Sequence, residues 1–252
     1  MKARSLVRAL LGAAALLAAK PASAQGVDVF GPYGGLENHG FVRSRQDVAF
    51  EVRFGHYDPN VDDGLTGTPY KDTFGSGHHW QGGAELDWQL YRRPGLLSLG
   101  PGFGFGYTHA AGKAPLESGT GVSEQDTTLG IFPMHLVAVL RFDYLADRTP
   151  IPLQPYAKLG LGYALWWSSI GNETSRVNGE AARGASYGYV WALGVLLRLD
   201  PLEPSAAANA DASLGINHAG FFIEWFNSGL DSFGKGMDVG TNTWVAGLGL
   251  EI

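Results

Sequence analysis

The chain contains no cysteine among its 252 residues. It therefore forms no disulfide and no thiolate metal site, and it offers neither a cysteine nucleophile nor a cysteine for an N-terminal lipid anchor. Basic residues are also scarce, with 18 Lys and Arg against 24 Asp and Glu and a formal net charge of −6. This balance argues against nucleic acid as a partner, because nucleic-acid-binding proteins present basic surfaces.

Long hydrophobic runs are confined to the N-terminus. Positions 1–24 combine basic residues (Lys2, Arg4, Arg8), the apolar stretch ALLGAAALLAA and the small-residue site Ala22-Ser23-Ala24, a pattern typical of a signal peptide. Its removal leaves 14 basic and 24 acidic residues. Beyond it, no apolar run reaches the ~18 residues of a membrane helix. The glycine-rich positions 25–46 are expected to form an N-terminal periplasmic segment or a plug.

Apolar and polar residues alternate with a period of two in eight segments, as in strands with one apolar face. The segments are 47–57, 80–90, 97–110, 132–144, 155–167, 186–199, 220–226 and 243–252. Long and short connections alternate between them, as in membrane barrels with short periplasmic turns. One of the expected short connections carries PSAAANADAS, which we expect to form a small periplasmic helix. Pro101 and Pro133 lie inside segments, and each is expected to mark a bulge or a strand end.

The direction of the apolar face separates a soluble, lipocalin-like barrel from a membrane barrel. Large aromatic residues near the segment ends favour lipid, as in interfacial girdles: Trp80, Trp88, Tyr107, Tyr144, Trp167, Tyr187 and Trp244. Four alternate glycines, Gly100 to Gly106, leave one face of a strand bare. Each costs about 0.5–1 kcal/mol relative to alanine. In a narrow eight-stranded lumen they would make room for long side chains from opposite strands.

These patterns predict an all-β protein, an eight-stranded antiparallel up-and-down transmembrane β-barrel over positions 47–252. We expect a monomer in the bacterial outer membrane, in contact with outer-membrane lipids and lipopolysaccharide and inserted by the barrel-assembly machinery. We expect no cofactor, no metal and no enzymatic activity. The role is then structural or one of surface interaction, and the specific activity stays open.

Charged residues on the polar faces predict two lumen walls of opposite charge. Arg141, Lys158 and Arg198 form the basic wall, and Arg53 and Asp143 are expected to be local partners within the walls. The acidic wall comprises Glu51, Glu85, Asp87, Glu224 and Glu251. Buried charges need partners, so the favoured interpretation is a salt-bridge network that fills the lumen. A narrow pore is the alternative.

The loops carry residue types that two further kinds of chemistry require. A lipid-modifying hydrolase or acyltransferase needs a histidine beside a serine and a carboxylate, and the candidates are His78, His79 and His109 with Ser76, Ser118 or Asp126. Their spacing matches no motif. Residues 58–64, DPNVDDG, resemble an acidic calcium loop without the EF-hand pattern, so a solvated loop is favoured. Residues 68–75, TPYKDTFG, either contact lipopolysaccharide or a partner or pack over the barrel mouth.

Residues 50–75, 214–226 and the closing TWVAGLGLEI resemble a family of exported outer-membrane β-barrel proteins found mainly in myxobacteria and their relatives. The resemblance implies the fold and the location. The family has no assigned activity, so the resemblance implies no catalytic residues. Ile252 departs from the pattern of outer-membrane barrels, which usually end in an aromatic residue.

Overall fold

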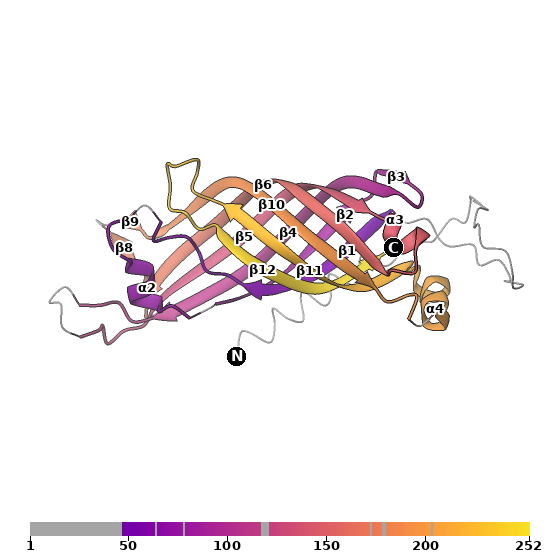
Figure 1. The fold of residues 1–252 in the computed structure, drawn as a ribbon. Helices are drawn as coiled ribbons and strands as arrows, with labels where there is room; N and C mark the ends of the chain where they lie inside the picture. Colours follow the sequence, from indigo (N-terminus) through magenta and orange to yellow (C-terminus); the bar gives the residue numbers. More distant parts are fainter. Residues whose placement is uncertain are drawn as a thin grey trace, which may run out of the picture. The chain divides into compact units, whose positions relative to one another are not determined.

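The computed structural model describes residues 47–63, 65–77, 79–116, 121–171, 173–177, 180–202 and 204–252. The expected signal peptide and the segment 25–46 lie outside these ranges. Eight long antiparallel strands form a barrel (Figure 1): β1 (Val48–His56), β2 (Trp80–Trp88), β4 (Leu97–Gly112), β5 (Thr127–Phe142), β6 (Leu153–Ile170), β10 (Arg183–Arg198), β11 (His218–Gly229) and β12 (Thr241–Glu251). Each pairs with the next in this order, and β12 pairs with β1, which closes the barrel. The predicted fold class is confirmed.

Short helices and strands lie at both ends of the barrel. One end carries β3 (Tyr91–Arg93), α3 (Tyr144–Arg148) and α4 (Pro204–Leu214). The other carries α2 (Pro69–Phe74), β8 (Arg176–Val177) and β9 (Glu180–Ala181), with β7 (Glu173–Thr174) extending the sheet beside β6 (Figure 1). Within the described ranges, no helix is both long and apolar enough to cross a membrane.

The expected helix after β10 is present as α4. Its first residue is Pro204, whose fixed φ suits the first helical position. An alanine-rich body follows, and Gly215 with φ of +69° ends it, donating its backbone N–H to Asp211 O at 2.9 Å.

Pro101 lies inside β4, beside an irregularity in the neighbouring strand. Asp87 of β2 lies opposite Gly102, whereas Tyr91 of β3 lies opposite Leu99. Three residues on the β2–β3 side therefore face two residues on β4. This is the bulge expected near Pro101, and it belongs to the partner strand.

Pro133 lies inside β5 and shifts no register. The β4–β5 pairing runs up to Phe105 opposite Met134 and resumes at Thr108 opposite Ile131. The ladder is interrupted there because proline has no N–H to donate. The prediction of a bulge or a strand end is therefore wrong for Pro133, whereas for Pro101 the bulge alternative holds.

The barrel carries its apolar side chains on the outside. Leu136, Leu159, Leu161 and Phe221 of the central strand segments are 55–66% exposed. All seven aromatic residues expected in the girdles are exposed as well. The opposite faces of the same strands are buried and rich in charge. This distribution is that of a barrel surrounded by lipid and the reverse of a water-soluble barrel.

Candidate functional site

The barrel interior is the candidate site, because charged side chains converge there from most of the strands. All ten charged residues predicted to face the lumen are buried, none more than 6% exposed: Glu51, Arg53, Glu85, Asp87, Arg141, Asp143, Lys158, Arg198, Glu224 and Glu251. The alternation of each strand is what turns these side chains inward. The structure divides them into a central network and a group at the end that carries α3 and α4.

Lys158 of β6 lies in the middle of the network. Its Nζ is 2.7 Å from Glu51 Oε2, 2.6 Å from Glu85 Oε1 and 3.3 Å from Glu224 Oε2. These carboxylates belong to β1, β2 and β11, so the ion pairs cross the lumen. Basic and acidic walls meet here.

Arg141 of β5 makes the second set of contacts between the walls. Its guanidinium pairs with Asp87 and lies 3.3 Å from Glu51 Oε1. Its Nε is 4.0 Å from Glu251 Oε1 on β12. One arginine thereby contacts three strands of the acidic wall.

Arg53 neutralises the acidic wall from within, as its place on β1 suggested. Its Nη1 donates to Glu85 Oε2 at 2.5 Å and to Glu51 Oε2 at 3.2 Å, and its Nη2 donates to Glu224. The guanidinium carbon also lies 5.5 Å from the centre of the Phe226 ring, where a cation is attracted to the aromatic face.

Arg198 does not face the acidic wall, and that part of the two-wall prediction is wrong. Its Nη1 donates to Asp147 of α3 at 2.7 Å, and its Nε is 3.4 Å from Asp200 Oδ2. His218 completes the group, with Nδ1 2.5 Å from Asp200 Oδ2. Burial alone would raise the pKa of Asp200, but the hydrogen bond and charge of His218 and the charge of Arg198 hold it below its usual value.

Asp143 also has a different partner from the one expected. Its Oδ1 accepts a hydrogen bond from Gln154 Nε2 at 2.6 Å instead of forming a local ion pair with the basic wall. Burial raises the pKa of this carboxyl above its ordinary value. This contact forms because Asp143 lies between the end of β5 and the start of α3, close to Gln154 at the start of β6.

Besides Gln154 and the partners of Arg198, two residues that contact the acidic wall were not among the predicted site residues. His135 Nε2 is 2.7 Å from Glu85 Oε2, and the Tyr156 hydroxyl donates to Glu224 Oε2 at 3.0 Å. Tyr156 stands two residues before Lys158 and His135 an even number of residues before Arg141, so the period of two places both on the inner face. This even spacing from the predicted lumen residues is the sequence signal that could have identified both partners.

The bare face of β4 is occupied by neighbouring side chains. A Cβ on Gly102 would lie 2.1 Å from Asp87 Oδ1, and one on Gly104 would lie 2.3 Å from His135 Nε2. A Cβ on Gly106 would lie 2.2 Å from Gln81 Nε2. These side chains come from β2 and β5, which pair with β4. The glycines therefore make room for adjacent strands and not for opposite ones.

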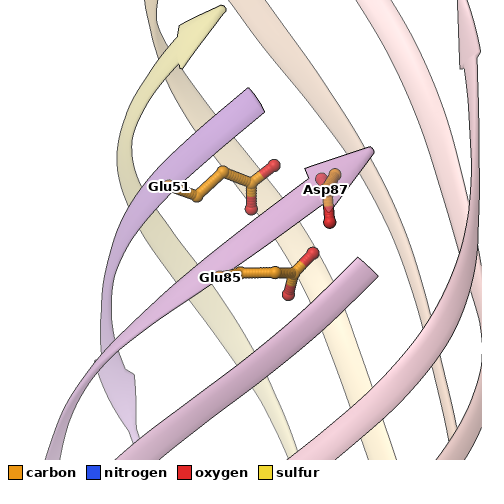
Figure 2. A group of neighbouring side chains, drawn as sticks. All are labelled: Glu51, Glu85 and Asp87. Carbon is orange, nitrogen blue, oxygen red and sulfur yellow. The ribbon is translucent and has the colours of Figure 1, made fainter. Parts of the chain in front are cut away.

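Three carboxylates of the network lie close enough to share a cation. Figure 2 shows Glu51, Glu85 and Asp87 projecting from β1 and β2 into the lumen. One carboxylate oxygen of each lies within 4.8 Å of those of the other two. Lys158 already contacts the first two, and Arg141 contacts the first and third. Their side chains supply the positive charge that a metal ion would otherwise bring.

An apolar cluster closes the end of the barrel that carries α2. Buried side chains from strands, loops and helix pack together there: Tyr57, Tyr70, Ala110, Leu129, Ile131, Ala164, Leu230 and Val239. Phe74 of α2 packs against them, and the Tyr57 hydroxyl donates to Val239 O at 2.5 Å. The segment 68–75 therefore packs over the barrel mouth, one of its two expected roles.

The candidate catalytic groups are not gathered into one site in the described ranges. His79 Nδ1 is 3.1 Å from the Tyr70 hydroxyl, and His109 is exposed on β4. His78 and Ser118 lie outside the described residues. In the acidic loop, Asp62 accepts the backbone N–H groups of Tyr70 and Lys71 at 2.7 and 3.1 Å, so its carboxylate holds the start of α2.

Two small cavities lie beside the charged network in the described part of the barrel. One, beside Glu51 and Arg141, has a volume of about 10 Å³, and another, beside Arg53 and His135, has about 20 Å³. A single water needs roughly 10–15 Å³. Each of these two cavities has room for about one water.

No protein-family model and no curated protein sequence matches the chain. Among solved structures, OprG from Pseudomonas aeruginosa is 15% identical with a TM-score of 0.50, covering 83% of this chain and 97% of OprG. Ail of Yersinia pestis, solved with the heparin analogue sucrose octasulfate, is 12% identical with a TM-score of 0.43, over 82% of this chain and 97% of Ail. The barrel domain of OprF from Pseudomonas aeruginosa is 13% identical with a TM-score of 0.35, over 82% and 98%. The chain has the fold of bacterial outer-membrane β-barrels, and the myxobacterial resemblance stays a prediction.

Proposed function

We propose that this chain is an integral protein of the bacterial outer membrane whose barrel is filled by its own side chains and holds the outer loops at the cell surface. The observation that carries this proposal is the set of ion pairs from Lys158 and Arg141 across the lumen. Contacts with lipopolysaccharide, insertion by the barrel-assembly machinery and a monomeric state belong to the same proposal.

The interior chemistry argues against ion flow. A passing ion would have to separate Lys158 and Arg141 from buried carboxylates, and breaking a buried ion pair costs about 3–5 kcal/mol. It would also need a continuous file of water, whereas the two cavities beside the network have room for about one water each. The apolar cluster around Tyr57 and Ile131 adds a second barrier at the outer mouth.

Membrane location is tested by outer-membrane fractionation and by migration on gels with and without heating. A folded barrel is expected in the outer-membrane fraction and to migrate differently after boiling. A protein that stays soluble without detergent would contradict the proposal.

Conduction is tested in planar bilayers. The purified protein is expected to give no steady conductance. A steady conductance in the wild type that changes when Lys158 or Glu85 is neutralised would favour the narrow-pore alternative. An enzymatic role is tested by comparing the lipid A species of cells with and without the protein, and an unchanged profile is expected.

A further inference from the structure

The loop between β11 and β12 presents an aromatic side chain on strained backbone. Ser232 and Phe233 both have φ of +56°, and they are the non-glycine residues with positive φ in the described ranges. This region is unfavourable for bulky L residues. Strain of this kind persists where surrounding contacts hold it, and it gathers at functional positions.

Asp231 holds the strained turn in place. Its Oδ1 accepts the backbone N–H of Phe233 and its Oδ2 that of Gly234, both at 2.9 Å. The backbone N–H of Ser232 donates to Tyr187 O at 2.9 Å. As a result Ser232 is 8% exposed and Phe233 is 63% exposed. The turn buries the serine and directs the phenylalanine outward, the reverse of what water alone would favour.

The Phe233 ring continues the apolar outer surface of the barrel. Its centre is 5.7 Å from that of Tyr187 in an edge-to-face arrangement. Tyr187 is an exposed girdle residue of β10 and pairs with Tyr163 of β6, which is exposed as well. β11 ends at Gly229, while β10 extends to Arg183 beyond this level. The loop therefore adds an aromatic ring to the girdle where β11 ends.

We propose that Phe233 inserts into the outer leaflet at the boundary between acyl chains and headgroups and fixes the β11–β12 loop to the membrane surface. The inference rests on the proposed membrane location. Its support is the continuity of Phe233 with the lipid-facing girdle and the aromatic preference for this interface. The charged neighbour Lys235, two residues later and exposed, is expected to remain in water.

The absence of native cysteine allows single labels to be placed without background. Phe233→Cys, Lys235→Cys and Leu161→Cys are each labelled with a nitroxide and reconstituted in phosphatidylcholine vesicles. Leu161, 65% exposed on β6, is the lipid reference, and Lys235 is the aqueous control in the same loop. Collision rates with oxygen, which concentrates in lipid, and with a water-soluble nickel chelate are then compared.

The label at Phe233 is expected to resemble that at Leu161, with oxygen access exceeding nickel access, and the label at Lys235 to show the opposite. If the Phe233 label matches Lys235 while Leu161 stays in lipid, insertion is wrong and the membrane location stands. Low access to both reagents at Phe233 would place a protein contact there and also overturn the proposal. Nickel access at Leu161 as well would overturn both proposals together.

Discussion

Single side chains in the interior carry more than one interaction each. Lys158 contacts Glu51, Glu85 and Glu224, and Glu85 also contacts Arg53 and His135. A charge in such a position is offset only while its partners remain. The residue-scale predictions therefore concern what happens when one partner is removed.

Removing the central ammonium is expected to destabilise the barrel. Lys158→Met leaves Glu51 and Glu224 without this partner, at a cost of about 3–5 kcal/mol in unfolding free energy. Urea unfolding in detergent or lipid, followed by tryptophan fluorescence, measures the loss. Lys235→Met, on an exposed loop position, is the matched control and is expected to change stability by less than about 0.5 kcal/mol. Equal effects of the two variants would contradict the network.

Charge reversal tests whether the walls meet. Lys158→Glu is expected to destabilise, and Glu85→Lys in the same chain to restore part of the loss, with a coupling of about 0.5–3 kcal/mol. The restoration is partial because Arg53 and His135 also contact Glu85. Strictly additive losses in a double-mutant cycle would show that the two residues do not interact.

Two carboxyls at the end that carries α3 and α4 are expected to give opposite pH dependence. Burial raises the pKa of Asp143 in the folded barrel. The stability that its protonated form contributes is therefore fully present below the unfolded pKa of about 3.9 and is lost as the pH rises through the folded pKa. Asp200, with a lowered pKa, contributes above about 3.9 and loses that stability as the pH falls.

The corresponding variants separate the two effects. Asp143→Asn retains an acceptor for Gln154 and is expected to stabilise the barrel at neutral pH. Asp200→Asn removes a charged partner of His218 and is expected to cost about 1–3 kcal/mol at neutral pH. Unfolding midpoints of the two variants and the wild type at pH 4 and pH 7 give the pH dependence of stability that each carboxyl contributes. The same sign for the two variants at pH 7 would show that the assignment of the shifts is wrong.

At the scale of the element, β4 shows how backbone approach and side-chain size are linked. Gly102 and Gly104 lie opposite Asp87 and Glu85 of β2, and both would clash with a polar atom if they carried a Cβ. Glycine occurs here despite its conformational-entropy cost, because neighbouring side chains already fill the space that a Cβ would need. Its outer face keeps Phe103 and Tyr107 exposed.

Adding one methyl group to this face is expected to be costly. In Gly104→Ala the Cβ would lie 2.3 Å from His135 Nε2 and 3.1 Å from Glu85 Oε2, and such overpacking costs about 1–3 kcal/mol. Gly82→Ala on β2 is the control, because its Cβ would meet only the Phe54 ring at 3.6 Å. That variant is expected to be neutral or slightly stabilising in urea unfolding. A Gly104→Ala barrel as stable as the wild type would refute the close packing.

At the scale of the whole molecule, closure joins each of the eight long barrel strands to two neighbours. β12 pairs with β1 over seven residue pairs, from Ala49–Glu251 to Gly55–Val245. The interior network then links strands that do not pair, such as β6 with β1 and β11. Loss of any strand would expose both an edge and buried charges.

We therefore expect unfolding in one cooperative transition. Lys158→Met and Gly104→Ala alter different strands but are expected to lower the midpoint of the same transition. Tryptophan fluorescence and the heat-dependent gel shift should give coincident curves. Separate transitions by the two probes would indicate that part of the barrel unfolds by itself.

The sequence by itself determined the strands, their faces and the identity of the buried charges. Alternation is a local property, so the inward direction of Glu85 or Lys158 follows from the parity of each strand. The glycines on one face of β4 and the helix after β10 could also be predicted, because both depend on the local sequence.

Only the tertiary structure decided which charges meet. Arg198 pairs with Asp147 and Asp200, and Asp143 accepts a hydrogen bond from Gln154, because height within the lumen depends on the register between strands and on where each turn begins. The packing of α2 over the mouth and the outward turn of Phe233 depend on loops with no periodic pattern. Register and loop geometry arise from contacts between segments distant along the chain, and closure of the barrel fixes them together.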